Sequence, residues 1–308
     1  MSYSFLRESK LYLVYGGTKY NIRTTSAITF NQTFAEDSYP VKTLHEQTKM
    51  FEGSTITKAN PATFTVEVPL TIEKDESIVL DLISDLVATT DAGISTQQLK
   101  SFDMYVQTGS STFKIENCII TQAVFDINRT DQFKVQLEGE GTKLSRGGDE
   151  NFSIPGSAQS ETSTRTPLLV FPSISIGGTN VKSLLSCNVQ IQNNVEWTPF
   201  ENLQNSLSVT SPSNVQYPDT YTVGTRIVSG AITQYQTDNN INDHVDFSTN
   251  VELIITAKKV SDSSDFWKLT LNPAMYTARL NPSDIYTKSY DYRSLDNTAV
   301  GTRISVYS

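Results

Sequence analysis

The sequence has few of the residues on which most enzymes and disulfide-rich proteins depend. Its 308 residues include two cysteines, Cys118 and Cys187, and two histidines, His45 and His244. Two thiols cannot cross-link a chain of this length into a disulfide framework. Neither histidine has a cysteine or a second histidine nearby in sequence. The sequence therefore offers few ligands for a zinc site and little support for a Ser-His-Asp triad. We therefore expect no enzyme activity, no catalytic residue, no metal and no cofactor.

Long apolar runs and clusters of basic residues are also missing. No segment approaches the roughly 18 consecutive apolar residues of a membrane span, and the opening MSYSFLRESKLYLVYGG is too polar for a signal peptide. The chain has 33 acidic residues against 24 lysines and arginines, a formal net charge of −9. The basic residues stand singly, which disfavours tight binding of nucleic acid or of an anionic membrane. We expect synthesis in the cytoplasm and no membrane insertion.

Two weak motifs favour structural roles. The segment DNNIND from Asp238 has the first, third and fifth ligands of a calcium loop but lacks the glycine and glutamate that complete it, so a turn is expected. Trp197 and Trp267 could stack on a sugar, but each continues an apolar strand pattern and is expected in the core.

What the sequence has in abundance is alternation of apolar and polar residues. The segment SAITFNQTF places Ile28, Phe30 and Phe34 on one face of a strand, and TFTVEVPL and QFKVQLEGEG alternate in the same way. FDMYVQTGSSTFKIENCII consists of two β-favouring runs around a turn and predicts a hairpin. NVQIQNNVEW, VELIITAKKV and FWKLTLNPAMYTARL continue the pattern in the second half. The chain is therefore predicted to be mainly β.

One segment, DESIVLDLISDLV, predicts a helix. Asp75 or Ser77 can cap its start. Its apolar residues recur at the three-and-four spacing of one buried face, at Ile78, Leu82, Ile83 and Leu86.

The second half of the chain repeats the order of the first. Gly-Gly-Thr at 16–18 and at 177–179 each precede an alternating strand, followed by a long irregular segment (35–61 or 198–218) and a Thr-rich strand. Residues 147–166 are poor in large apolar residues and predict a linker. We therefore expect a duplication that produced two tandem domains, 1–146 and 167–308. Each is expected to be a β-sandwich or half-barrel with at most one helix and a long arm loop.

The first long segment, 35–61, is too apolar for a free loop. Loops of this length are uncommon in compact domains unless they serve a function, and apolar side chains need a surface to cover them. We expect it to be an arm that packs on another molecule, with these contact candidates: Tyr39, Val41, Leu44, Met50, Phe51 and Ile56.

This order of elements resembles the tail tube proteins of long-tailed bacteriophages, and the two-copy layout resembles a variant with two fused tube domains. The closest stretch is Gln132–Leu144, whose strand ends in Gly-x-Gly; the second copy has no such ending. The resemblance implies a structural protein of the virion tail. It implies that three chains form a ring of six tube domains with pseudo-sixfold symmetry, and that stacked rings form a tube. It also implies that the arm bridges rings, that DNA passes through the lumen during ejection, and that other tail or baseplate proteins are partners.

A channel for DNA should not hold DNA. Each phosphate neutralised by lysine or arginine adds affinity, whereas carboxylates and amides repel the backbone or touch it weakly. The polar strand faces suit this requirement, and combined with the resemblance they predict these lumen-facing residues: Thr29, Asn31, Thr65, Glu67, Gln136, Glu138, Gln190, Gln192, Asn194 and Glu196.

Two other functions stay open at this point, because a β fold alone does not fix function. An all-β adhesion or baseplate module of a virion would bind glycan or protein as a small oligomer. An enzyme would have a cleft with acids of perturbed pKa. A tube protein is distinguished from both by polymerisation.

Overall fold

The structure is a computed structural model. It describes residues 9–40, 51–71, 76–84, 87–91, 94–128, 131–159, 165–199, 217–241, 243, 248–282, 284–294 and 304–306. Within these ranges the chain forms 21 strands and one helix, so the prediction of a mainly β protein is confirmed.

The elements of the first half are β1 (Lys10–Tyr15), β2 (Thr18–Ile22), β3 (Thr29–Asn31), β4 (Phe34–Pro40), β5 (Phe51–Ala59), β6 (Ala62–Pro69), α1 (Ser77–Ser84), β7 (Val87–Asp91), β8 (Ile94–Gln98), β9 (Phe102–Gln107), β10 (Ser111–Ile127), β11 (Lys134–Gly141), β12 (Lys143–Asp149) and β13 (Ser157–Ala158). Those of the second half are β14 (Val170–Ile176), β15 (Thr179–Asn180), β16 (Leu184–Pro199), β17 (Pro218–Tyr235), β18 (Ser248–Lys259), β19 (Asp265–Asn281), β20 (Thr287–Ser294) and β21 (Ile304–Val306).

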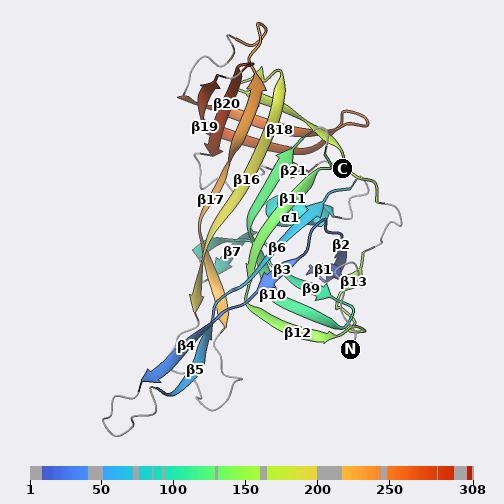
Figure 1. Cartoon of the computed structure of the whole chain (residues 1–308), viewed down its shortest axis with the longest axis vertical. Helices are drawn as coiled ribbons and strands as arrows, with labels where there is room; N and C mark the ends of the chain where they lie inside the picture. Colours follow the sequence, from blue (N-terminus) through green and yellow to red (C-terminus); the bar gives the residue numbers. More distant parts are fainter. Residues whose placement is uncertain are drawn as a thin grey trace.

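The two halves pair their strands in the same order. In the first half the order is β3–β6–β11–β10, with β9, β1 and β2 continuing from the start of β10 and with β12 on its other side. In the second half it is β16–β17–β20–β19, with β18, β14 and β15 continuing from β19 and with β21 on its other side. β10 pairs with β16 and joins the halves into one sheet (Figure 1). Among the described strands the pairing never returns to its start, so this sheet is open.

The repeated Gly-Gly pairs have a conformational reason. Gly16 and Gly17 have φ of 57° and 79°, and Gly177 and Gly178 have φ of 57° and 81°. Two successive residues in this region form the tight hairpin turn whose twist matches its strands, and glycine adopts it without strain. Each pair turns the chain from β1 to β2 or from β14 to β15.

Alternation produces a buried and an open face. β6 and β11 bury every second side chain, among them Val66, Val68, Val135 and Leu137, as predicted. The hairpin predicted around 108–111 is formed by β9 and β10. Phe34 is an exception, because 44% of it is exposed. The expectation that it shares the apolar face with Ile28 and Phe30 is wrong, since the chain leaves the sheet after β3 and Phe34 begins β4.

Both halves contribute to one hydrophobic core. Trp267 is fully buried, as predicted, with its ring 5.0 Å from that of Phe125. Phe266 packs edge-on to Phe133 at 6.3 Å. β18 and β19 therefore pack across the end of the first half's sheet rather than forming a separate core.

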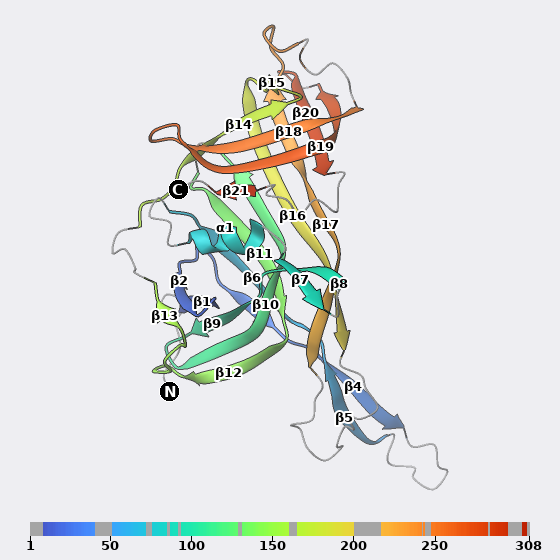
Figure 2. The same ribbon diagram turned by 180° about the vertical axis from the view of Figure 1, so that it is seen from behind.

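The predicted helix is confirmed as α1, which lies on the core side of the sheet (Figure 2). Ile78, Leu82 and Ile83 are buried, but so are Val79 and Leu80. A helix that is apolar on nearly all sides has to be covered on nearly all sides, which is why no single buried face is seen. Asp75 and Leu86 lie outside the described residues.

Two segments predicted to be irregular carry strands. β4 and β5 pair from Phe34↔Ala59 to Pro40↔Phe51 and form a hairpin that projects from one end of the molecule (Figure 1). β16 and β17 stay paired as far as Pro199↔Pro218. The prediction of irregular structure is therefore wrong at both ends of each segment. In β4 and β5 the cause is that polar and apolar residues do not alternate along the sequence, so no period of two marks these strands.

Other elements fall where the sequence predicts none. β7 and β8 form a further hairpin after α1. In the segment predicted as a linker, β12 reaches Asp149 and pairs with β10, and β13 pairs in parallel with β2. Part of this segment is therefore paired with the first half; the domain boundaries stay a prediction. The predicted turn after Asp238 is confirmed, with Asn240 Oδ1 accepting a hydrogen bond of 2.7 Å from the Thr237 amide. His45, His244 and Asn242 lie outside the described residues.

Candidate functional site

The residues predicted to face a channel lie together on one side of the joined sheet, the side opposite α1. Their strands place them by direct cross-strand pairing, for example Thr29 opposite Thr65 and Gln136 opposite Glu67. None of the ten is buried. We call this side the polar face. Its role in a channel stays a prediction, but the sequence-derived residues do form one surface.

The polar face continues across the junction between the halves. One row of directly opposite residues crosses seven strands, from β6 to β19: Glu67, Gln136, Val124, Gln190, Ser229, Arg293 and Met275. At the junction Asn188 Nδ2 donates to Asp126 Oδ1 over 2.7 Å. The pairing of β10 with β16 therefore makes one surface out of two.

Sequence reasoning missed about half of this surface. These further residues belong to it: Gln122, Asp126, Asn188, Ser229, Arg279, Asp291 and Arg293. β10 has no single alternation along its length, because its register shifts between Ile120 and Gln122 and this reverses the facing of side chains along the strand. In β20 the alternation of Tyr290 and Tyr292 with Asp291 and Arg293 was a readable signal.

Two of the cations on the polar face are held by carboxylates, whereas the exposed Arg293 contacts the sulfur of Met275. Lys134 Nζ lies 3.3 Å from Glu67 Oε1, and Arg279 forms an ion pair with Asp291. Glu67 also accepts a hydrogen bond from the Thr25 hydroxyl. This hydrogen bond, followed by that of Lys134 and its positive charge, holds the pKa of Glu67 below its ordinary value against the opposing effect of burial. The face thus carries side chains of both signs of charge, and its surroundings favour the ionised form of Glu67.

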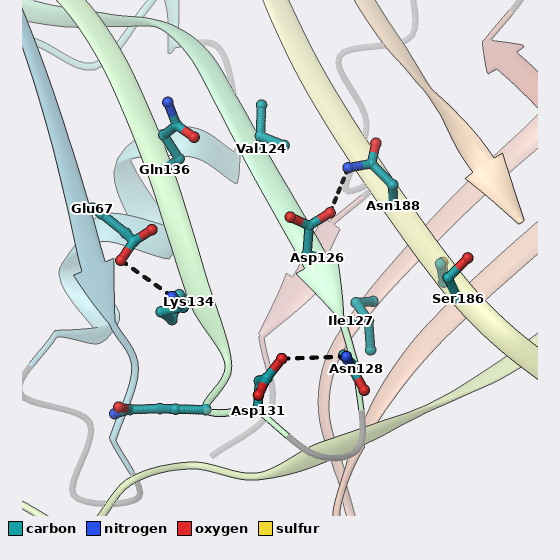
Figure 3. A pocket seen from close by; sticks show the side chains of 12 residues that line it. Glu67, Val124, Asp126, Ile127, Asn128, Asp131, Lys134, Gln136, Ser186 and Asn188 are labelled. Atoms are coloured by element: carbon teal, nitrogen blue, oxygen red, sulfur yellow. Dashed lines mark hydrogen bonds and ion pairs between the residues drawn. The ribbon is translucent and has the colours of Figure 1, made fainter. Parts of the chain in front are cut away.

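Two shallow hollows follow the junction on this face. The first, of about 430 Å³, lies between β6 and β16 and contains the Glu67–Lys134 and Asp126–Asn188 pairs (Figure 3). The second, of about 470 Å³, lies over the second half. Asn188 lines both, so the hollows adjoin. Their side chains offer carboxylates, amides and hydroxyls for weak polar contact.

Neither cysteine thiol is exposed on this surface. Cys118 and Cys187 are buried, and burial raises the pKa of both thiols, that of Cys187 to about 12. A thiol in this state is a poor nucleophile. Among the described residues no group of three or more histidine, cysteine, aspartate or glutamate side chains could hold a metal ion.

The projecting hairpin contains part of the predicted arm. Tyr39 lies in β4, and Phe51 and Ile56 lie in β5. Val41, Leu44 and Met50 lie outside the described residues. The equivalent part of the second half, the outer end of β16 and β17, packs on the first half. There Trp197, which is partly buried rather than in the core, donates from Nε1 to Glu140 over 2.6 Å.

Comparison with known proteins narrows the identity. No helix in the described part of the chain is long and apolar enough to cross a membrane. No curated protein sequence matches the chain. A family model described as the Bacteriophage Baseplate Tube Protein Family matches residues 1–301. This match spans nearly the whole chain and agrees with the tube resemblance of its β pattern, so the chain belongs to the bacteriophage baseplate tube protein family and is a structural component of the virion.

Proposed function

We propose that the chain is a tube subunit built from two fused tube domains that arose by duplication. One observation carries the proposal: the sets β3–β6–β11–β10 and β16–β17–β20–β19 have the same pairing order and are joined edge to edge by β10 and β16. Each set carries the same accessory strands as well. Duplication explains this repetition more simply than two separate origins.

The same join can be made between chains. β3 lies at one end of the joined sheet and pairs only with β6 among the described strands, and the far end of β19 is the equivalent of the β10 edge that β16 covers. Contacts of this head-to-tail kind close into a ring when the rotation between subunits divides a full turn, and closure removes free strand edges. Three chains would then form a ring with pseudo-sixfold symmetry.

In such a ring the polar face lines the channel. Lys134 and Arg279 are neutralised by carboxylates, and Glu138 and Glu196 add negative charge. A wall of this composition gives DNA few cations to bind, so DNA passes without being held. The β4–β5 hairpin, with its arm candidates, contacts the next ring or another tail or baseplate protein, and the protein acts without enzyme activity.

Negative-stain microscopy of the purified chain tests the assembly. We expect rings, or short stacks of rings, whose class averages have threefold symmetry with six similar lobes. A chain that stays monomeric at high concentration, by microscopy and by light scattering, would overturn the proposal. Deleting 39–55 should leave rings intact and stop their stacking, since among the described strands β4 and β5 pair only with each other.

Charge reversal tests the polar face. Changing Glu67, Glu138 and Glu196 together to lysine should leave assembled particles that eject DNA more slowly, most of all at low salt, because each new cation can bind a phosphate. The matched control changes the same three residues to glutamine, which removes negative charge without adding positive charge. Unchanged ejection by the lysine variant would contradict the placement of this face in the channel.

A further inference from the structure

Strands β10 and β19 hold equivalent places in the two halves, but their joining edges differ. β9 pairs with β10 only as far as Cys118, and this leaves Gln122–Ile127 open for β16. β18 is longer than β9. It continues past the corresponding point and pairs with β19 as far as Thr277.

The pairing, counted from the two Gly-Gly turns, fixes which residues are equivalent. Tyr12 and Ser173 each lie four residues before their turn, and cross-strand pairing leads from them to Lys114 of β10 and Lys268 of β19. Counting paired positions onward from these two lysines brings Ala123 and Tyr276 to the same place.

In the first half, Val66 lies opposite Leu137, which lies opposite Ala123. In the second half, Gly230 lies opposite Tyr292, which lies opposite Tyr276. Tyr276 of β19 is therefore the equivalent of Ala123 of β10. The edge that β16 covers on β10, Gln122–Ile127, corresponds to Met275–Leu280 on β19.

The start of β18 occupies half of that edge. Ser248 lies opposite Thr277, Thr249 opposite Tyr276 and Asn250 opposite Met275. β20 pairs with the same residues of β19, so β18 must lie on the other side, the side that β16 takes on β10. Three of the six joining positions are thus already paired within the chain.

The other half of the edge lacks its cover. Leu280 is 45% exposed, whereas Ile127, its equivalent at the internal junction, is 1% exposed because Cys187 of β16 lies opposite it. No described strand pairs with Ala278–Leu280 on this side. An apolar side chain exposed at the end of an open edge indicates a missing strand.

β3 of a second copy fits this edge in register. Ile191 of β16 pairs with Ala123 and Val228, and its equivalent in β3 is Phe30, which pairs with Phe64. Transferring the internal register places Phe30 opposite Tyr276. Thr29 then falls opposite Thr277, so that core-facing and polar residues match across the junction. In that register Thr29, Phe30 and Asn31 take the positions that Ser248, Thr249 and Asn250 hold in the free chain.

We propose that Ser248–Val251 guards the joining edge of β19 in the free chain and has to leave it before β3 of a second copy adds there. The inference rests on the proposed self-assembly. This segment, which we call the guard, forms hydrogen bonds with backbone groups of β19 that could otherwise pair with any exposed strand of another molecule. Its replacement exchanges one set of backbone hydrogen bonds for another, so the net gain comes from covering Leu280 and the partly buried Ile28 and Phe30.

A disulfide lock tests the guard. Ser248→Cys with Thr277→Cys places two cysteines directly opposite each other on paired strands, within the spacing that a disulfide spans. When oxidised, this variant should give about tenfold fewer rings or more, since a covalently held strand cannot leave the edge. Reduction should restore the yield. The matched control, Lys258→Cys with Asp265→Cys, cross-links the same two strands away from the joining edge and should assemble in both redox states.

An opening variant completes the test. Asn250→Pro breaks the start of β18, because proline cannot donate to the ladder. It should assemble at lower protein concentration than the wild type. If the oxidised lock assembled as well as the wild type, the guard would be wrong and the proposed function would still stand. Assembly by Asn250→Pro at a lower protein concentration than the wild type needs would support the guard. Failure of the wild type, the reduced lock and Asn250→Pro to assemble would overturn both.

Discussion

The two halves share their backbone pairing but fill the space behind it differently. In the first half, Val66 faces Leu137 across the β6–β11 pair. In the second half, Gly230 faces Tyr292 across the β17–β20 pair. The tyrosine is fully within the core and its hydroxyl donates to the Asn188 carbonyl over 2.9 Å. The first half thus fills this space with two medium-sized side chains. The second half fills it with one large side chain that faces a glycine.

This comparison explains how two halves with the same strand pairing can have different core residues. Strand order depends on backbone hydrogen bonds, which any alternating sequence can form. Core packing depends on total volume, which several combinations of side chains satisfy. Each half can therefore change its core as long as facing positions change together.

The largest effect on stability is expected when the valine of the first half is placed at the equivalent position of the second half. A Cβ on Gly230 would lie 2.0 Å from the Asn188 oxygen and 2.5 Å from Tyr292 Oη, so neither the backbone of β16 nor the tyrosine ring could stay in place. Gly230→Val should lower the free energy of unfolding by about 4 kcal/mol or more, from overpacking and from loss of a buried hydrogen bond. Chemical denaturation measures this.

A double variant sharpens the same comparison. Gly230→Val with Tyr292→Leu recreates the valine–leucine pair of the first half and should recover roughly half of the loss, because facing residues couple when they share a space. Ala231→Val, one residue along and on the polar face, is the control and should change stability by less than about 0.5 kcal/mol. If the effects of Gly230→Val and Tyr292→Leu on the free energy of unfolding simply added, the two facing residues would not share one space and this explanation would be wrong.

Sequence reasoning captured the parts of the fold that alternation determines. β6, β11 and the ten polar-face residues follow from a period of two in strands with one side buried. It failed for β4 and β5, whose sequences lack a period of two, and for β10, where a register shift changes the facing partway. The early start of β18 could not be read either, since pairing partners are set by tertiary structure rather than by local sequence.

The next effect concerns how the halves are connected. Arg165, just before β14, lies 2.5 Å from Glu76 at the start of α1, and their side chains are only 3% and 0% exposed. Thr71 also donates to Glu76 over 2.8 Å. Arg165→Met should cost about 3 kcal/mol in unfolding free energy, because it leaves a buried carboxylate without its counter-charge. Thermal and chemical denaturation should both detect it.

The paired change separates the buried charge from packing. Glu76→Gln with Arg165→Met removes both charges and should restore most of the stability, since a neutral buried pair does not carry the desolvation cost of a lone ion. If the double variant were as unstable as Arg165→Met, the ion pair would not be what fixes this connection.

A smaller and local effect distinguishes the two hairpins. The outer end of β16–β17 is anchored on the first half, where Tyr221 donates to the Leu99 carbonyl over 3.0 Å and Trp197 packs on Tyr221 with ring centres 5.2 Å apart. Trp197→Ala should weaken this ribbon by about 2 kcal/mol, less than for a fully buried tryptophan. Hydrogen exchange should rise at the paired amides near Glu196 and Thr222 while the melting temperature changes little. Trp197→Phe is the control. Equal exchange in both variants would contradict the anchor.

The smallest effect is expected on the polar face, where the halves differ in a titrating group: Glu67 in the first half corresponds to Ala231 in the second. The pKa of Glu67 is lowered mainly by the Thr25 hydroxyl and less by Lys134. A depressed pKa in the folded chain stabilises it above the ordinary value of 4.5, and this contribution is lost as the pH falls through the folded value. Thr25→Ala should therefore raise the pKa toward 4.5 and make stability less dependent on pH in this range. At neutral pH the cost should stay below about 0.5 kcal/mol, because water screens the partly exposed carboxylate. A carboxyl NMR titration follows Glu67 directly, with Lys134→Met as the comparison. A larger rise in Lys134→Met than in Thr25→Ala would show that charge, rather than the hydroxyl, sets the ionisation of this face.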